Sequence, residues 1–447
     1  MKVDSRLGIQ DMKEDHTAIY QRAAGQFERY TALLKDELRA ATGCTEPIAI
    51  AYCAALSARA LGTVPTRCEA ACSGNVIKNT KTVTVPNTGG MKGIKAAVLA
   101  GVLFGDADRE LEVLSAVSPD EAETIKKTAG TLPVAVKLLK SGHSLHIQVT
   151  CFAGEDWASA EIMDTHTGVT RVTRNGAAVF ERDGKLTPDS QETGPDEAAL
   201  NVADILDYAR RVDLGGIRDV LLRQAAYNSA IAKAGMSGDW GASVGKTLLL
   251  ARGDNDKTRI VSGAAAGADA RMNGCALPVI INSGSGNQGM TASLPVVERA
   301  RQLGAPEELL LRALAVSNLV SIHQKTAIGR MSAYCGAVSA ATGSAAGIAF
   351  LEGASDEVIK QTIVNSLAVT SGMLCDGAKS SCAGKIANAL DGALLAYEMA
   401  KRDLGYQAGE GIVKKDVEST IQGVGHIASQ GMRETDIEVL QVMIRED

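Results

Sequence analysis

Small residues dominate this chain and limit how it can pack. The sequence contains 46 glycines, whereas aromatic residues make up only 3% of its 447 positions. Where a side chain is reduced to hydrogen, two backbones can approach one another closely. We therefore expect a core of Ala, Gly, Val and Leu with close helix–helix contacts and tight turns, rather than one built on large aromatic anchors.

The first part of the chain alternates between helical and strand patterns. Amphipathic periodicity predicts helices near 24–38, 47–61 and 93–104, and Thr45 followed by Pro47 is typical of a helix start. Alternating apolar residues predict strands joined by a Gly-Asn turn within 67–85, and short strands at 144–152, 158–163, 169–174 and 178–182.

A polar segment at 183–197, with two prolines and two glycines, is the best candidate for a boundary. Beyond it, helical periodicity continues to the end of the chain and is interrupted by glycine-rich loops. The predicted class is α+β. Residues 1–190 are expected to form a mixed α/β domain with short strands that carries the Gly43–Pro47 motif, and 191–447 a mostly helical, Gly/Ala-rich domain.

Charge and hydropathy exclude several classes of partner. The net charge is −6 and basic residues are interspersed with acidic ones, whereas nucleic-acid-binding domains carry a basic stripe. Residues 331–351 lack charge, but serines, threonines and glycines interrupt them, which favours a buried core helix over a membrane span. The polar N-terminus shows no secretory signal, so we expect a cytoplasmic protein with nine reduced cysteines.

Three distant cysteines are candidate ligands of an iron–sulfur cluster. Cys335 begins the uncharged segment, and Cys375 and Cys382 bracket the loop Cys-Asp-Gly-Ala-Lys-Ser-Ser-Cys. Three cysteine ligands on a [4Fe–4S] cluster leave one iron open, as a Lewis-acid catalyst requires. On spacing alone, three unrelated buried thiols remain the stronger interpretation.

Cys44 differs from these three because it directly precedes a predicted helix. Amide N–H groups and the helix dipole stabilise a negative charge at such a position, which lowers the pKa of a thiol and favours a reactive thiolate. The nearby Glu46 partly opposes this effect. A plain buried thiol is the alternative.

The segment Ser-Gly-Ser-Gly-Asn-Gln-Gly at 283–289 follows an apolar, strand-like run and is a candidate anion-binding loop. Its candidate substrate-binding residues are Ser283, Ser285, Gly286 and Asn287. A simple flexible turn is the alternative, and the loop 87–93 with Lys92 is a weaker second candidate for gripping substrate.

Other sequence patterns are weaker candidates for a functional site. Residues 241–247 resemble a phosphate-binding P-loop but are one position short and lack a preceding strand. Packing in the core is the preferred interpretation of Cys53, Cys68, Cys72, Cys151 and Cys275. His143 and His146 lack a nearby acidic residue in the sequence and are expected on the surface, while His323 is a candidate to face the cluster.

Taken as a set, residues 43–47, 283–289, 335–336 and 375–385 resemble the L-cysteine desulfidase family, which is related to the iron–sulfur L-serine dehydratase α chain. The resemblance runs from about residue 30 to the C-terminus and keeps the order of four cysteines. It implies that Cys335, Cys375 and Cys382 bind the cluster and that Cys44 is the general base. Bacterial serine dehydratases also carry a C-terminal cysteine that can cap the open iron, but no cysteine follows Cys382 here, which favours the desulfidase branch.

The implied reaction is a β-elimination that converts L-cysteine to pyruvate, ammonia and sulfide. Three alternatives stay open: an iron–sulfur dehydratase acting on L-serine or L-threonine, a pyridoxal-phosphate lyase, and a non-catalytic redox sensor in which Cys44 is a fourth ligand. The pyridoxal-phosphate alternative requires a Schiff-base lysine, and neither Lys246 nor Lys257 lies in a convincing context. The expected partner is a small amino acid rather than a nucleic acid or a membrane, and a homo-oligomer remains open.

Overall fold

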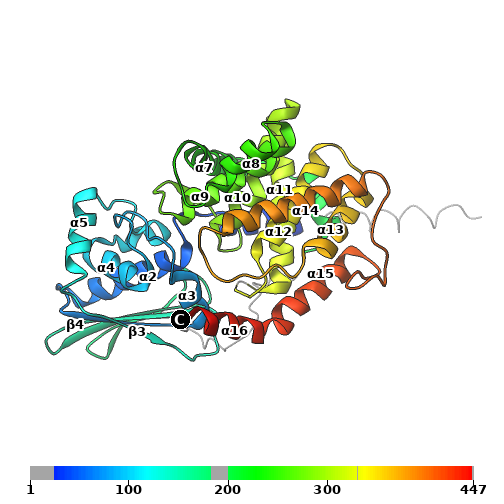
Figure 1. Cartoon of the computed structure of the whole chain (residues 1–447). Coiled ribbons are helices and arrows are strands. Elements are labelled where there is room, and N and C mark those ends of the chain that lie inside the picture. Colours follow the sequence, from blue (N-terminus) through cyan, green and yellow to red (C-terminus); the bar gives the residue numbers. More distant parts are fainter. Residues whose placement is uncertain (1–24, 183–199, 330, 445–447) are drawn as a thin grey trace, which may run out of the picture.

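The strands of the computed structural model form two sheets, and the helices pack on and beside them (Figure 1). The structure describes residues 25–182, 200–329 and 331–444. The strands are β1 (Ala40–Thr42), β2 (Arg67–Cys72), β3 (Val134–Leu138), β4 (His146–Ala153), β5 (Asp156–Met163), β6 (Val169–Arg174), β7 (Ala177–Glu181) and β8 (Pro278–Ile280). The predicted α+β class is confirmed.

Helices account for most of the remaining chain. Residues 25–37 are helical. The α-helices that follow are α2 (Thr45–Leu61), α3 (Gly74–Thr80), α4 (Gly93–Phe104), α5 (Pro119–Thr128), α6 (Val202–Arg211), α7 (Arg218–Ser237), α8 (Val244–Arg252), α9 (Asp256–Met272), α10 (Gly286–Leu303), α11 (Glu307–Ile328), α12 (Gly336–Leu351), α13 (Asp356–Thr370), α14 (Cys382–Ala400), α15 (Val417–His426) and α16 (Arg433–Ile444). Three short turns of other helix types are η1 (Ala107–Glu112), η3 (Leu214–Gly216) and η4 (Ile427–Gly431).

The larger sheet has the order β3-β2-β4-β5-β6-β7, and only the β2–β3 pair is parallel. Helix α2 packs across β4, β5 and β6. Cys68 on β2 lies opposite Cys151 on β4, and both are buried together with Cys53 of α2 and Cys72. Core packing is therefore confirmed for these four thiols.

Two expectations about this region are wrong. Residues 74–80 form helix α3 rather than the predicted Gly-Asn turn, because this segment buries Val76 and Lys78 and packs against α16. The second strand expected up to Val85 is reduced to an isolated bridge between Thr84 and Lys92. His143 and His146 are buried, and their ring nitrogens lie 2.8 Å from carboxylate oxygens of Asp164 and Glu161. These carboxylates come from the neighbouring strand β5 and the turn after it, so the partners are close in space although they are distant in sequence.

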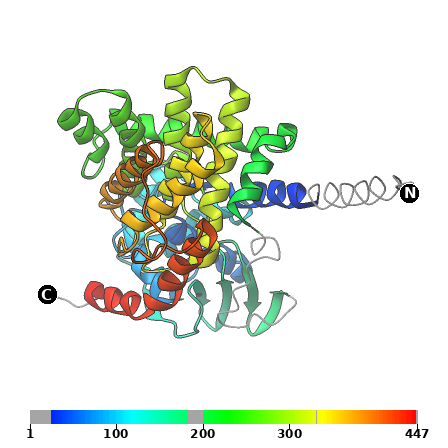
Figure 2. The ribbon, with the colours of Figure 1, turned by 90° about the vertical axis from the view of Figure 1, so that its right-hand side faces the viewer.

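The helical part is organised around α12. Fifteen of its residues, from Ala337 to Leu351, are buried, and α10, α11, α13 and α14 surround it (Figure 2). The predicted buried core helix within 331–351 is thus confirmed. Among the described residues, no helix has the length and apolar character needed to cross a bilayer.

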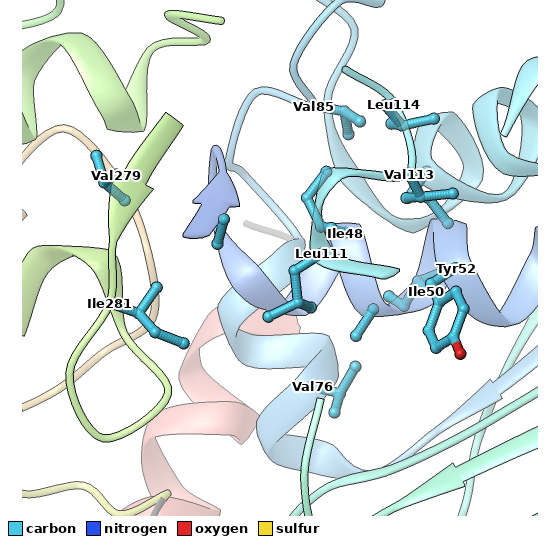
Figure 3. Packing of buried hydrophobic residues seen from close by; sticks show 14 of the residues in the cluster. Ile48, Ile50, Tyr52, Val76, Val85, Leu111, Val113, Leu114, Val279 and Ile281 are labelled. Carbon is cyan, nitrogen blue, oxygen red and sulfur yellow. The ribbon is translucent and has the colours of Figure 1, made fainter. Parts of the chain in front are cut away.

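The two parts of the chain are joined by strand pairing and by a shared core. Strand β1 pairs antiparallel with β8, with Ala41 opposite Val279. Val279 and Ile281 belong to the same buried cluster as Ile48 and Leu111 (Figure 3). The segment 183–197 lies outside the described residues, and the division at about residue 190 stays a prediction.

Glycines set how closely several helices approach. A Cβ atom at Gly235 of α7 would lie 1.9 Å from the carbonyl oxygen of Ala266 in α9. A backbone carbonyl cannot rotate away as a side chain can, so any side chain at this position separates the two helices. The close helix contacts expected from the composition are present here.

We expect Gly235→Ala to lower the free energy of unfolding by about 1–3 kcal/mol, because the added methyl overpacks the α7–α9 contact. The matched control is Gly263→Ala in α9, where an added Cβ meets nothing within 4 Å. That control should be neutral or stabilising by up to about 1 kcal/mol, since alanine is the better helix former. Thermal unfolding of both variants measures the difference, and equal midpoints would contradict the expectation.

Candidate functional site

Backbone pairing brings Cys335 and Cys375 together although they are 40 positions apart in the sequence. Tyr334 and Leu374 form an isolated antiparallel bridge. On either side of it, Cys335 N donates to Met373 O (2.9 Å) and Cys375 N donates to Ala333 O (2.6 Å). Both residues line the same cavity.

Cys382 reaches the same place from the start of α14. Its Sγ lies 3.7 Å from the carbonyl oxygen of Gly377. Gly377 has a φ of 90°, and a Cβ there would lie 2.3 Å from Lys78 O, so this turn of the loop requires glycine. Cys335, Cys375 and Cys382 line one cavity of about 120 Å³, and Cys44 lines it as well.

Four helices begin at this cavity. Cys44, Ser285 and Cys335 are the N-cap residues of α2, α10 and α12, and Cys382 is the first residue of α14. All four residues line the cavity. Because the N-terminus of a helix presents unpaired N–H groups and a partial positive charge, this arrangement favours anionic contents.

The charged side chains of the lining have the same effect. They are four cations and one carboxylate: Lys78, Lys325, Lys385, Arg271 and Glu46. Lys78 forms an ion pair with Asp436 of α16, and Lys385 one with Asp376. The Cys335 thiol and these two lysines lower the pKa of Cys375.

The donor set fits an iron–sulfur cluster, because cysteine thiolates are the usual ligands of such clusters. Among the described residues, no three His, Cys, Asp or Glu side chains converge closely enough to hold a single metal ion. A cluster differs in this respect, since each sulfur binds a different iron and the ligands are spread around a larger group. Positive surroundings also suit a cluster bound by thiolates.

Cys44 is part of a hydrogen-bonded group that the sequence did not reveal. Its Sγ donates to Glu46 Oε2 (3.0 Å), and Asn79 Nδ2 donates to Glu46 Oε1 (2.9 Å). His166, from the turn between β5 and β6, has its Nε2 3.8 Å from Glu46 Oε1. Gly43 makes the turn into this position with a φ of 69°, and a Cβ there would lie 2.1 Å from Pro86 Cγ.

The expected lowering of the Cys44 pKa is wrong. Burial raises the pKa of Cys44 well above its usual value, and the negative charge of Glu46 raises it further, while Arg271 acts in the opposite direction. Burial also raises the pKa of Glu46, but His166 and the Cys44 thiol outweigh burial and bring it to about 2. At neutral pH, Cys44 is therefore a thiol and Glu46 a carboxylate.

Residues 282–285 form a tight turn rather than a flexible one, and 286–289 are the first residues of helix α10. Ser283 and Gly284 both have positive φ (48° and 77°), and Asn282 and Ser285 exchange backbone hydrogen bonds across them, as in a type I′ turn. Thr45 Oγ1 donates to Gly284 O (2.9 Å), which ties the loop to the start of α2.

Three of the four predicted substrate-binding residues, Ser283, Ser285 and Asn287, line the cavity. Their polar atoms already have partners within the protein. Ser283 Oγ donates to Asn282 Oδ1, and Ser285 Oγ caps α10 by accepting from Gln288 N. Gly286 lies behind the wall against Arg271, whose Nη1 donates to Asn287 Oδ1 (3.0 Å).

Other candidates from the sequence lie elsewhere. Lys92 is exposed at the N-cap of α4 and does not line the cavity. His323 is buried and its Nε2 contacts Glu418 (2.7 Å) instead of the cavity. Lys246, which pairs with Asp239, and Lys257 are also away from it.

Arg271 and His166 are site residues that sequence reasoning missed. Arg271 lies in the last turn of α9, where a basic residue is ordinary, and His166 lies in a short turn without a motif. Neither position carries a local signal.

The sequence profile of one known family, described as serine dehydratase alpha chain, matches residues 108–441. The chain belongs to the serine dehydratase alpha chain family. The match includes the three candidate ligands, whereas Cys44 precedes it. Dehydratases are lyases that act on small molecules, and this family is associated with iron–sulfur chemistry.

Similar proteins extend this relationship over nearly the whole chain. A UPF0597 protein of Lachnoclostridium phytofermentans is 47% identical over 418 residues, which cover 94% of this chain and 100% of that protein. A UPF0597 protein of Desulfitobacterium hafniense is 47% identical over 426 residues, covering 95% and 99%. One from Treponema denticola is 45% identical over 428 residues, covering 94% and 98%.

We expect Glu46→Gln to lower the pKa of Cys44, because the change removes a negative charge that raises it. Thiolates, not thiols, react with iodoacetamide. The pH midpoint of Cys44 alkylation, followed by peptide mass spectrometry, should therefore move to lower pH. In the control Glu161→Gln, which alters the carboxylate beside His146, the midpoint should stay in place. A midpoint that stays or rises in Glu46→Gln would show that this carboxylate does not set the charge of Cys44.

Proposed function

We propose that this protein is an iron–sulfur lyase that degrades L-cysteine to pyruvate, ammonia and sulfide by β-elimination. In this proposal, Cys335, Cys375 and Cys382 bind a [4Fe–4S] cluster that keeps one iron open, and Cys44 is the catalytic base. The observation that carries the proposal is the meeting of three candidate ligands and Cys44 in one cavity with positive surroundings.

The elimination breaks two bonds of the substrate. The Cα–H proton passes to the Cys44 thiolate, and the Cβ–S bond breaks with its electron pair leaving on sulfide. The product, 2-aminoacrylate, tautomerises to an imine, which water hydrolyses to pyruvate and ammonia. When bound, such a cluster supplies a Lewis-acidic iron that polarises the substrate.

Cys44 must lose its own proton before it can accept one from substrate. The nearest acceptor is Glu46 Oε2, 3.0 Å from Sγ. Because burial and Glu46 disfavour the thiolate, positive charge in the cavity is needed to stabilise it, and Arg271 contributes such charge. Glu46 then acts as the positioning residue that accepts a hydrogen bond from the thiol and orients it.

A second candidate is dehydration of L-serine or L-threonine, which the family match favours. The two functions share the elimination and differ in the leaving group. Sulfide and ammonia released from L-cysteine, L-serine and L-threonine by anaerobically purified protein would separate them. We expect L-cysteine to give the highest kcat/KM, and a preference for L-serine would assign the second function.

Substitution of the cysteines separates cluster binding from catalysis. We expect Cys335→Ser, Cys375→Ser and Cys382→Ser to lose iron and acid-labile sulfide, measured on anaerobic protein. Cys44→Ser should keep its iron and lose activity by about 10²–10⁴-fold, the usual contribution of a general base. Cys275→Ser, which removes a buried thiol outside the cavity, is the control and should keep both.

Two outcomes would refute this assignment. Loss of iron from Cys44→Ser would favour the redox sensor with four cysteine ligands. Inactivation by borohydride together with absence of iron would favour a pyridoxal-phosphate lyase. The cytoplasmic location and the number of subunits stay predictions.

A further inference from the structure

Arg271 is a buried cation with an incomplete set of partners. Its side chain ends in the cavity wall, and the residue is 2% exposed. Nη1 donates to Asn287 Oδ1 (3.0 Å), whereas Nε and Nη2 have no hydrogen-bond partner within residues 25–182, 200–329 and 331–444. Burial lowers the pKa of Arg271 from its ordinary value, and the nearby Cys44 and Glu46 act against this.

The two unpaired atoms form one edge of the guanidinium group. Nε–H and the N–H of Nη2 point in parallel from this edge, at the spacing of the two oxygens of a carboxylate. Arginine binds carboxylates in this bidentate way, and a lysine cannot reproduce it. The free edge is therefore shaped for a planar anion with two oxygens.

A buried guanidinium group without hydrogen-bond partners destabilises the folded protein. Desolvation of a charged group costs several kcal/mol unless hydrogen bonds and opposite charge compensate. The described residues leave two donors of Arg271 unmet in this cavity, and a bound ligand can complete its set of hydrogen bonds. Such a feature is typical of a binding site that is completed by its ligand.

We propose that the Nε–Nη2 edge of Arg271 binds the α-carboxylate of the amino acid substrate. This inference rests on the proposed function for the identity of that substrate. The sequence predicts that the 283–289 segment binds substrate directly, whereas this proposal gives that role to Arg271. The loop holds the arginine, and the arginine holds the carboxylate.

Two residues of the loop keep the guanidinium in place. Asn287 fixes the Nη1 end of the group. Gly286 leaves room at the other end, since a Cβ there would lie 2.4 Å from Arg271 Nε and 2.5 Å from Val279 Cγ2. A Cβ there would also lie 2.7 Å from Arg271 Cζ, so a side chain at position 286 would press on the face of the guanidinium group and displace it.

The test is binding of two probes to the anaerobically purified protein by calorimetry. L-alanine carries the α-carboxylate and α-ammonium of the substrate but no leaving group, and ethylamine is the same molecule without the carboxylate. We expect Arg271→Met to bind L-alanine about 100-fold more weakly than the natural protein, the loss of two charged hydrogen bonds. Arg271→Lys should also weaken it, and ethylamine binding should be equally weak in all three proteins.

Thermal unfolding and iron content distinguish this role from a structural one. Because Arg271→Met removes unmet donors, we expect its unfolding midpoint, measured without ligand, to be unchanged or higher, with iron content intact. Arg299→Met is the control, since Arg299 pairs with Glu352 outside the cavity and should not affect L-alanine binding. A lower midpoint or loss of iron in Arg271→Met would instead assign the guanidinium to the fold or the cluster.

Equal L-alanine affinity in Arg271→Met and the natural protein would overturn the inference, as would absence of L-alanine binding by the natural protein. These results differ from failure of the proposed function, which would show as natural protein without iron or without sulfide release. Carboxylate binding by Arg271 requires neither, so the L-alanine comparison remains decisive in that case.

Discussion

The convergence of four helix N-termini on one small cavity is the constraint on which the site depends. Helices α2, α10, α12 and α14 direct their free N–H groups to the same place, and three lysines and Arg271 add full charges. Bringing this much positive charge together is unfavourable unless negative charge balances it. Asp436 and Asp376 pair with two of the lysines and Glu46 is ionised. In the proposed function, thiolates and a substrate carboxylate supply the rest of that balance.

Two opposing effects set the protonation state of Cys44 in this cavity. Burial and Glu46 keep the thiol protonated, whereas Arg271 favours the thiolate. If a substrate carboxylate binds Arg271, its negative charge offsets part of the positive charge that stabilises the Cys44 thiolate. The ammonium group of the substrate must then supply positive charge in its place. The charge on Cys44 therefore depends on what occupies the cavity.

The sequence predicted the individual helices and strands more accurately than it predicted which residues come together in the cavity. Local periodicity identified α2, α4 and five strands of the large sheet, because burial of one face sets a repeat of 3.6 or 2, but it missed β3. It failed at α3, where a segment with β-branched residues is helical because Lys78 and Val76 are buried by tertiary contacts. Spacing alone also favoured unrelated cysteines, and only the set of motifs pointed to a common site. Arg271 and His166 were out of reach, since their roles come from residues far away in the chain.

The pairing of β1 with β8 has a consequence for synthesis of the protein. At about 5–20 residues per second, β1 waits roughly 10–50 seconds on the ribosome before β8 has been made. During this interval Cys44 and its helix lack the wall that later encloses them. In the proposed function the three candidate ligands are made later still, since Cys335, Cys375 and Cys382 all follow β8 in the chain.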